Sequence, residues 1–590
     1  MPEAHSPHGG WMHFQRAKRN LQIGVLKLGA DIRLSHPRLE FELGIAGPAL
    51  SITPKQAVVA PLTSSMAAAL ADLLRKKLEK ELERKAIDNE IVRIQLEYSS
   101  LANRTSKILS LPLEVTAAIF HLLSWERNQF SPPDPIETVS RVCKSWRTLA
   151  LSRPEYWDAF FSEGENHSQV DRLLAYLERS KDRPFDFDVS VGRRYPTVTE
   201  KLLEVAVEHM HRWRRFSFIC EANMMWQGTE SIKKLHAISA PGLESIQISI
   251  DSLINSAETV RQTKFLRGQA GKLTTLYLDA TWFADASWLQ GFPSVKNIQI
   301  HNNGGLASYL SPKLPTETLT RLFECPNLES LSAAGLLIEK FVTFPIIKTK
   351  ASKLKYLRCS DESMLEFVLH SVDAPKLELF IVQRQSFGNS LRITEHDDES
   401  PLFPSLHTLA FTDCSIDPGW AMDGAEVFYH FTLATNNAKH VYVTSNRPTN
   451  MEDRMFSDMA YQFTENGTIF YPNMERLYCE FDRDPEEVPN YTHYATIFKS
   501  RTESLKKHCT LHLNDVEAAF FEGSDPESWK IMEDGGYYRG LGRQYPDGID
   551  LVPWPPRAVR YEEDGWLCLS ELRSLSVDAM DPLHDQHVEE

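Results

Sequence analysis

The stretch "APGLESIQISI", Ala240–Ile250, decides the fold because the same phrase returns several times farther along the chain. It consists of a small turn containing Pro, Gly or Ser, one apolar residue, two mostly polar residues and an alternating apolar run. Alternation with a period of two is typical of a β-strand that buries one face. We therefore expect each copy of the phrase to be a turn that leads directly into a strand.

Seven further copies follow the first. They are "AGKLTTLYLDA" from Ala270, "FPSVKNIQIHN" from Phe292, "CPNLESLSAAG" from Cys325, "ASKLKYLRCSD" from Ala351, "APKLELFIVQR" from Ala374, "FPSLHTLAFTD" from Phe403 and "YPNMERLYCEF" from Tyr471. Starts of the first seven copies are separated by 30, 22, 33, 26, 23 and 29 residues. Intervening segments such as "TETLTRLFE" and "ESMLEFVLHSV" have helical spacing.

This pattern resembles irregular leucine-rich repeats, in which one short strand per turn of a solenoid joins a parallel sheet along a concave face. The helical segments would cover the convex side. No turn carries the asparagine ladder of regular repeats, so we expect a distorted solenoid. A Rossmann-like sheet also alternates strands and helices, but it would not repeat one turn phrase eight times.

A long helix is predicted upstream, over residues 63–106, where helix-forming residues dominate and no Pro or Gly occurs. Apolar residues recur every four positions from Leu70 to Leu82, and from Ile87 to Leu101 they recur with spacings of 4, 3, 4 and 3. We interpret them as one apolar stripe. It could be the seam of a coiled coil, although Lys85 interrupts the heptads, or a face that packs on the following domain.

Residues 107–162 predict a small helical module. Ser110 can cap a helix whose first turn contains Pro112, and the prolines of "RNQFSPPDP" require a loop. A second helix is expected over about Ile136 to Leu151. Short helices of this kind bury little surface alone, so we expect the module to need a neighbour.

The ordered pattern of Leu-Pro-x-Glu-Val, Ile-Phe, Val-Cys-Lys-x-Trp-Arg and Tyr-Trp within residues 111–157 resembles an F-box. It is similar to the F-box-like proteins abundant in mushroom-forming fungi. The resemblance implies docking on the Skp-type adaptor of a cullin-RING ubiquitin ligase. The implied adaptor-binding residues are Leu111, Pro112, Ile119, Phe120, Leu123, Val142, Cys143 and Trp146. The alternative is that these residues are the core of a helical hairpin.

The expected fold class is therefore α/β, with a long N-terminal helix and a small F-box-like module followed by an irregular leucine-rich-repeat solenoid with a parallel sheet. Six segments are expected. They are an irregular segment 1–62, the helix 63–106, the module 107–162, a linker and repeat cap 163–235, the repeat domain 236–520, and a closing segment with an acidic tail 521–590.

Composition excludes several classes of function. The net charge of −16 argues against nucleic-acid binding as the main activity. The eight cysteines form no Cys-x-x-Cys pair, and His209 and His211 would point to different faces of a helix, so we expect no metal site. No phosphate loop, serine elbow or zinc-protease motif occurs, and we expect no cofactor and no catalytic residue. No signal peptide or membrane span is indicated, which favours a cytoplasmic or nuclear protein.

Two functions remain from this reasoning. The first is an F-box substrate receptor that holds the Skp-type adaptor, and through it a cullin, while the repeat sheet holds an unknown client protein. The second is a protein-binding scaffold that uses the repeat surface outside any ubiquitin ligase. An enzyme with an unrecognised site in the C-terminal region is the third alternative.

Overall fold

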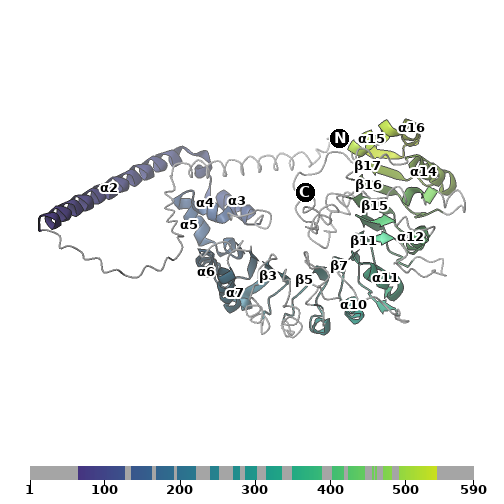
Figure 1. The fold of residues 1–590 in the computed structure, drawn as a ribbon, viewed down its shortest axis with the longest axis horizontal. Coiled ribbons are helices and arrows are strands. Elements are labelled where there is room, and N and C mark those ends of the chain that lie inside the picture. Colours follow the sequence, from purple (N-terminus) through teal and green to yellow (C-terminus); the bar gives the residue numbers. More distant parts are fainter. Residues whose placement is uncertain are drawn as a thin grey trace, which may run out of the picture. The chain divides into compact units, whose positions relative to one another are not determined.

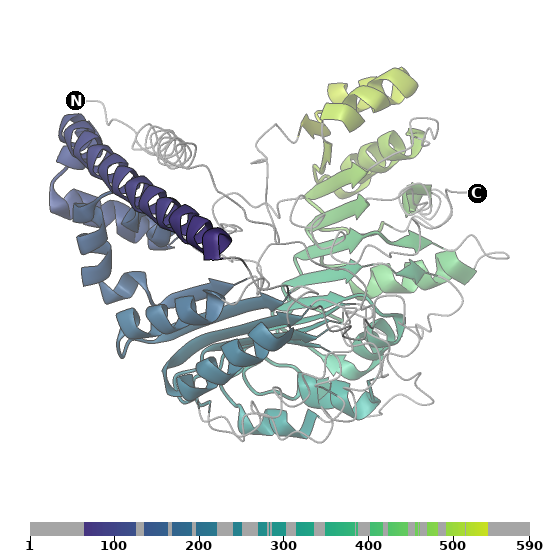
Figure 2. The ribbon, with the colours of Figure 1, turned by 60° about the vertical axis from the view of Figure 1, so that its left-hand side comes forward.

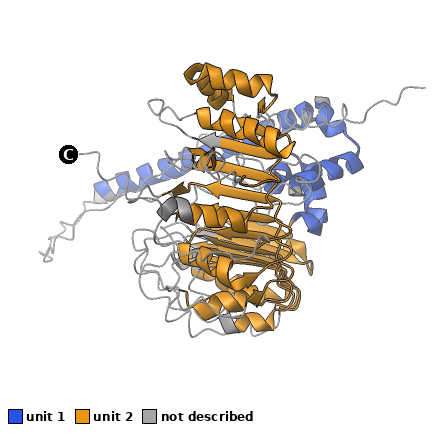
Figure 3. Cartoon of the chain, turned by 90° about the vertical axis from the view of Figure 1, so that its right-hand side faces the viewer, with its two compact units in different colours: residues 1–156 blue, residues 157–590 orange. Residues whose placement is uncertain are grey.

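The structure is a computed structural model of the 590-residue chain. It describes residues 64–125, 135–162, 168–191, 196–220, 240–250, 270–279, 283, 286–301, 314–334, 348–383, 385–387, 402–416, 423–445, 455–457, 459–460, 469–481, 491–513 and 515–540. The chain divides into two compact units, residues 1–156 and 157–590 (Figure 3). The expectations for residues 1–62, for the loop 126–134 and for the acidic tail lie outside the described residues.

Unit 1 is helical. Its elements are α2 (Ser64–Thr105), η1 (Lys107–Ser110), α3 (Leu113–Trp125), α4 (Pro135–Ser140), α5 (Lys144–Ser152) and η3 (Pro154–Tyr156). Figure 1 shows α2 as one uninterrupted rod, as its composition predicts. Exposed ion pairs three or four residues apart support it, for example between Lys77 and Glu81 and between Arg93 and Glu90.

The second helix of the module differs from the prediction of one continuous element. It is two short helices, α4 and α5, separated by Arg141, Val142 and Cys143. Cys143 has an extended backbone, with φ −152° and ψ 169°, and its Sγ accepts a hydrogen bond from the Trp146 N–H at 3.5 Å. Cys143 therefore caps a new helix instead of continuing the old one.

Unit 2 contains a long parallel sheet. Among the described residues, fourteen strands pair in the order β1-β2-β3-β4-β5-β6-β7-β9-β11-β13-β15-β16-β17-β18, so each pairs with the sheet strand before and after it in sequence. Their bounds are β1 Ala159–Ser162, β2 Phe185–Val191, β3 Trp213–Cys220, β4 Ser245–Ile250, β5 Thr275–Asp279, β6 Asn297–His301, β7 Ser330–Ala334, β9 Tyr356–Cys359, β11 Leu379–Gln383, β13 Thr408–Thr412, β15 His440–Ser445, β16 Arg476–Phe481, β17 Thr510–Leu513 and β18 Tyr538–Gly540. Two smaller parallel pairings join β8 (Thr349–Lys350) to β10 (Val372–Asp373) and β12 (Ser386–Phe387) to β14 (Ser415–Ile416).

Helices of unit 2 connect these strands and lie on the outer side of the row of strands in Figures 1 and 2. They are α6 Ser168–Ser180, α7 Pro196–Glu208, η4 Met210–Arg212, η8 Ala286–Gly291, α10 Thr316–Phe323, α11 Glu362–Ser371, α12 Asp423–Ala434, α14 Thr492–Leu505, α15 Asp515–Ser524 and α16 Pro526–Asp534. The predicted helices in "TETLTRLFE" and "ESMLEFVLHSV" are α10 and α11.

The repeated phrase has one local structure in all eight copies. The backbone N–H of its fourth residue donates to the carbonyl of its first at 2.8–3.2 Å, as in Leu243 to Ala240 and Met474 to Tyr471. Each fourth residue is buried, and the strand begins five residues after the phrase starts. The turn therefore buries its fourth residue and directs the following residues into the strand. This confirms the predicted turn and strand.

Register along the sheet separates apolar from polar side chains. One face carries Phe216, Ile246, Leu276, Ile298 and their equivalents, which are buried. This face packs on the helices, because Phe380 of β11 contacts Phe431 of α12. The opposite face carries polar side chains on many strands, because successive residues of a strand point to opposite sides.

Turns are also joined to one another by side-chain hydrogen bonds, although the sequence shows no regular asparagine ladder. Ser294 Oγ donates to the Gly271 carbonyl at 2.8 Å, and Asn327 Nδ2 donates to the Pro293 carbonyl at 2.7 Å. Equivalent bonds link Ser405 to Pro375 and Asn437 to Pro404. In each case the third residue of a turn binds the second residue of the preceding turn. A mixed Ser/Asn ladder thus takes the place of a regular asparagine ladder.

The sheet extends farther than predicted at both ends. β1 lies at the end of the predicted module 107–162, β2 and β3 lie in the segment 163–235 predicted as a linker and repeat cap, and β18 lies in the predicted closing segment 521–590. The two compact units divide after Tyr156. β15 was missed inside the long interval before Tyr471. Its turn has the same hydrogen bond, from the Ala438 N–H to the Thr435 carbonyl at 3.2 Å. The turn was not recognised because its sequence, Thr-Asn-Asn, contains no Pro, Gly or Ser.

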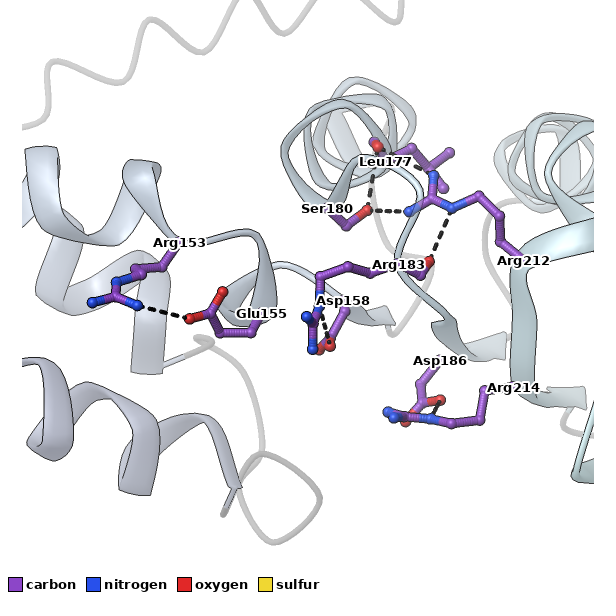
Figure 4. A network of polar contacts seen from close by, with 9 residues as sticks. All are labelled: Arg153, Glu155, Asp158, Leu177, Ser180, Arg183, Asp186, Arg212 and Arg214. Carbon is purple, nitrogen blue, oxygen red and sulfur yellow. Dashed lines mark hydrogen bonds and ion pairs between the residues drawn. The ribbon is translucent and has the colours of Figure 1, made fainter. Parts of the chain in front are cut away.

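A buried arginine fixes the first turns of unit 2 (Figure 4). Arg212 Nε donates to the Arg183 carbonyl at 3.0 Å, Nη1 to the Leu177 carbonyl at 3.3 Å and Nη2 to Ser180 Oγ at 2.6 Å. One guanidinium thereby provides hydrogen-bond donors to acceptor groups at the end of α6 and in the loop before β2. The Arg183 side chain instead forms an exposed pair with Asp158 at 3.3 Å.

We predict that Arg212→Met destabilises the protein by about 2–4 kcal/mol, because it leaves buried carbonyl groups without their charged donor. Urea unfolding followed by circular dichroism measures the change. Arg183→Met is the matched control and should cost about 0–1 kcal/mol, because its ion pair is exposed and its backbone carbonyl is retained. Equal effects of the two substitutions would contradict this assignment.

Candidate functional site

Two surfaces are candidates, one in each unit. In unit 1, the predicted adaptor-binding residues surround an aromatic cluster. Phe120 contacts Trp146 edge to face, with ring centroids 5.2 Å apart, and contacts Tyr156 at 6.1 Å. Tyr156 Oη donates to the Ala117 carbonyl at 2.8 Å, which ties η3 to α3. Burial raises the pKa of Tyr156, with a further increase from Glu155 and an opposing effect of Arg153.

This cluster contains two of the predicted adaptor-binding residues, Phe120 and Trp146. Phe120 is 0% exposed and Trp146 is 7% exposed, so both belong to the core of the module. In this conformation their side chains contact their own chain and are not presented to a partner. Their burial is what the helical-hairpin alternative expects at these two positions, and contact with an adaptor stays a prediction.

The other predicted contact residues are at least partly accessible. Leu111 is 36% exposed and Pro112 is also exposed, whereas Ile119, Leu123, Val142 and Cys143 are half-buried. Leu111 has an extended backbone, with ψ 143°, as expected for a residue before proline. Leu111 and Pro112 therefore form a short exposed apolar segment just before α3, which we call the Leu-Pro step.

Sequence reasoning missed two exposed residues of α3 as contacts. Val115 and Leu122 are 44% and 46% exposed, and with the half-buried Ile119 they follow the spacing of 4 and 3 that places residues on one helical face. We call Val115, Ile119 and Leu122 the apolar strip. Phe120 lies away from that face, so the helical period separates Phe120 from the apolar strip, but the period alone does not show which of the two is buried.

In unit 2, the face of the sheet opposite the helices is polar and half-buried from β2 to β6. We call its middle row the polar row; it consists of Asp188, Ser217, Gln247, Tyr277 and Gln299, one residue from each successive strand. Neighbouring side chains are connected, since Ser217 Oγ donates to Gln247 Oε1 at 3.4 Å. Amide, hydroxyl and phenol groups in one row offer both donors and acceptors to a bound chain.

Acidic residues give one end of this face a distinct charge pattern. Burial raises the pKa of Asp188, and neighbouring Asp186 raises it further, whereas the hydrogen bond from Ser217 lowers it. Asp186 is held by Arg214 through two hydrogen bonds of 2.8 and 2.7 Å. This bidentate pair, also drawn in Figure 4, fixes the carboxylate at the start of β2.

Farther along the same face, three aromatic rings stack across β15, β16 and β17. Tyr442 and Tyr478 are parallel within 4°, with centroids 4.3 Å apart, and Tyr478 stacks on His512 at 4.5 Å. All three are buried. We call them the aromatic ladder. Stacking of side chains in register rigidifies this part of the sheet.

Histidines on this face are held neutral. Burial, and then Arg476, lower the pKa of His512 to about 4, and the same two causes lower that of His440 to about 4. Thr510 Oγ1 lies 3.0 Å from His512 Nε2. An uncharged ring can stack on Tyr478 without burying a positive charge.

Within the described ranges, no cluster of three or more His, Cys, Asp or Glu residues has the geometry of a metal site, and the rings of His209 and His211 are 6.4 Å apart. No helix in this part of the chain is both long and apolar enough to span a bilayer.

Comparison with known proteins identifies no family. Neither a scan against protein-family models nor a search of curated proteins finds a match to this sequence. Functional inference therefore depends on the two surfaces themselves.

We predict that the unfolding free energy falls between about pH 6.5 and pH 4 partly because of His512. The unfolded histidine binds a proton near its ordinary pKa of 6.5, whereas the folded one does so only near 4, so lowering the pH favours unfolding. One such proton contributes a slope of up to about 1.4 kcal/mol per pH unit. His512→Phe keeps a ring in the ladder and should give a shallower fall in urea titrations.

Tyr478→Phe is the control, because it preserves the ring stacking and leaves His512 in place. It should retain the wild-type slope. A His512→Phe variant with an unchanged slope would show that His512 titrates alike in both states.

Proposed function

We propose that the chain is the substrate-recognition subunit of a cullin-RING ubiquitin ligase. In this proposal unit 1 is an F-box-like module that binds a Skp-type adaptor, and unit 2 is an irregular leucine-rich-repeat domain that binds a client protein. The observation that carries the proposal is the same turn hydrogen bond before nine consecutive parallel strands of the sheet, from β4 to β16. Such stacking is typical of repeat proteins that bind other proteins through an extended surface.

The adaptor would contact the Leu-Pro step and the apolar strip. Leu111, Val115 and Leu122 expose apolar area beside the compact Phe120 cluster, so a partner could cover them without unfolding the module. Burial of a few apolar anchors supplies much of the binding energy in protein interfaces. Phe120 and Trp146 are buried in the core of the module and would hold this surface in place.

The client would contact the polar row. Its half-buried side chains form a continuous polar surface over five strands, and Gln247 and Tyr277 can bind peptide groups of another chain. The client's identity would follow from matching its donors and acceptors to this row. Chemistry would belong to other subunits, because tethering raises the effective concentration of client lysines near a recruited conjugating enzyme.

A binding scaffold that acts outside any ubiquitin ligase is the second candidate. It is favoured by the burial of Phe120 and Trp146, which leaves fewer apolar anchors for an adaptor than the F-box resemblance implies. In that case the polar row would keep its role, and the apolar strip would serve another partner.

We predict that the purified full chain binds a purified Skp-type adaptor and that Leu122→Asp weakens this binding at least tenfold, because a carboxylate would be buried against the partner. Isothermal titration calorimetry measures the affinity. Leu174→Asp on α6 is the control; Leu174 is 47% exposed, close to the 46% of Leu122, and should leave adaptor binding unchanged.

Circular dichroism of Leu122→Asp checks that the module remains folded. If the wild-type chain does not bind the adaptor, the ligase proposal is wrong and the scaffold is favoured. If Leu122→Asp and Leu174→Asp bind as the wild type does, adaptor binding does not use the apolar strip.

A further inference from the structure

We propose that α2 pairs with the α2 helix of a second copy of this chain, in antiparallel orientation. The helix exposes large apolar side chains along its whole length, including Leu70, Leu73, Ile91 and Ile94, each at least 47% exposed. Contiguous exposed apolar surface of this extent is typical of an interaction site. At 1.5 Å per residue, the 42 residues of α2 extend about 60 Å.

The apolar residues of α2 do not form the single stripe that the sequence analysis expected. Leu74, Leu78 and Leu82 follow steps of four residues, which rotate about 40° per step around an α-helix. A different set keeps the alternating steps of four and three that define a coiled-coil seam. This seam contains Met66, Leu70 and Leu73 near one end and Ile87, Ile91, Ile94, Tyr98 and Leu101 near the other.

Three cations occupy the seam between these two apolar segments. Continuing the heptad places Lys77, Lys80 and Arg84 at successive seam positions. In a parallel pair, each seam residue faces its own equivalent, so the middle of the interface would stack three pairs of like charges. Such repulsion at consecutive layers disfavours the parallel pair.

An antiparallel pair removes these contacts. With Leu70 of one copy opposite Leu101 of the other, Leu73 lies opposite Tyr98 and the heptads stay in register. The same alignment places Lys77 opposite Ile94, Lys80 opposite Ile91 and Arg84 opposite Ile87. Every cation then meets an apolar side chain, and apolar layers close both ends.

The cations can be accommodated in these layers. Each is paired on its own helix, Lys77 with Glu81 at 3.7 Å, Lys80 with Glu83 at 2.7 Å and Arg84 with Asp88 at 3.7 Å. Their aliphatic stems can cover the opposite isoleucines while the charged ends remain in water.

Self-pairing also fits the charge of the helix as a whole. Its eight basic and seven acidic residues leave almost no net charge to attract a strongly charged partner. The apolar segment at each end instead matches the segment at the other end, as a two-fold symmetric interface requires.

Sedimentation velocity of the full chain tests the pairing, and we expect a concentration-dependent dimer. Ile94→Lys places a lysine opposite Lys77 and should raise the dissociation constant at least tenfold. Leu96→Lys is the matched control; Leu96 is 67% exposed, lies off the seam and should leave the dimer intact. A wild-type chain that stays monomeric at micromolar concentration overturns the proposal, as does equal weakening by both variants.

Two substitutions at one position test the orientation. Ile94→Glu would face Lys77 in the antiparallel pair and should weaken the dimer less than Ile94→Lys. In a parallel pair both variants would place like charges opposite each other and weaken it equally.

Disulfide trapping gives an independent measurement of orientation. We expect the double variant Leu70→Cys/Leu101→Cys to form a covalent dimer on mild oxidation, and Leu70→Cys alone to form no more than the wild-type chain with its native cysteines. Covalent dimer from Leu70→Cys alone would show a parallel pair. These results do not depend on adaptor binding, because the apolar strip lies on α3.

Discussion

The turn hydrogen bond that precedes the strands from β4 to β16 is the interaction on which unit 2 depends. It joins the first and fourth residues of the phrase, as in Ala240 and Leu243, and it buries the fourth residue against the helices' side of the sheet. Because the next backbone N–H groups bond to the preceding strand, every turn positions one strand relative to its neighbour. The Ser/Asn ladder then holds adjacent turns together. Each turn thus determines the position of one strand in the sheet relative to the strand before it.

Much of this fold could be predicted because the phrase combines two local signals. Turn residues mark where the chain bends, and the alternation after them marks which side is buried. The prediction fails where a turn is held by tertiary contacts and lacks the usual turn residues. At Thr435 the turn survives without Pro or Gly, since Asn436 Oδ1 accepts from the Tyr471 N–H at 2.9 Å. β1 and β2 were missed because no copy of the phrase precedes them.

The candidate sites were less predictable for a related reason. A resemblance assigns residue types to positions, but burial depends on what packs against them. Phe120 and Trp146 pair with each other and with Tyr156, which lies far along the chain, so no local pattern shows that they are covered. The polar row could not be predicted from the sequence either. Its members are separated by a full connection and are aligned only by register.

The fixed distance from turn to strand has an implication for how such a protein can change over generations. Connections between successive strands differ widely in length, yet the offset from Ala240 to Ser245 is the same as that from Tyr471 to Arg476. Residues gained or lost in a connection therefore leave the alignment of the sheet intact. The connections can vary in length while the strands keep their spacing, so the same sheet can accept new sequence between its strands without losing the residues that line its polar face.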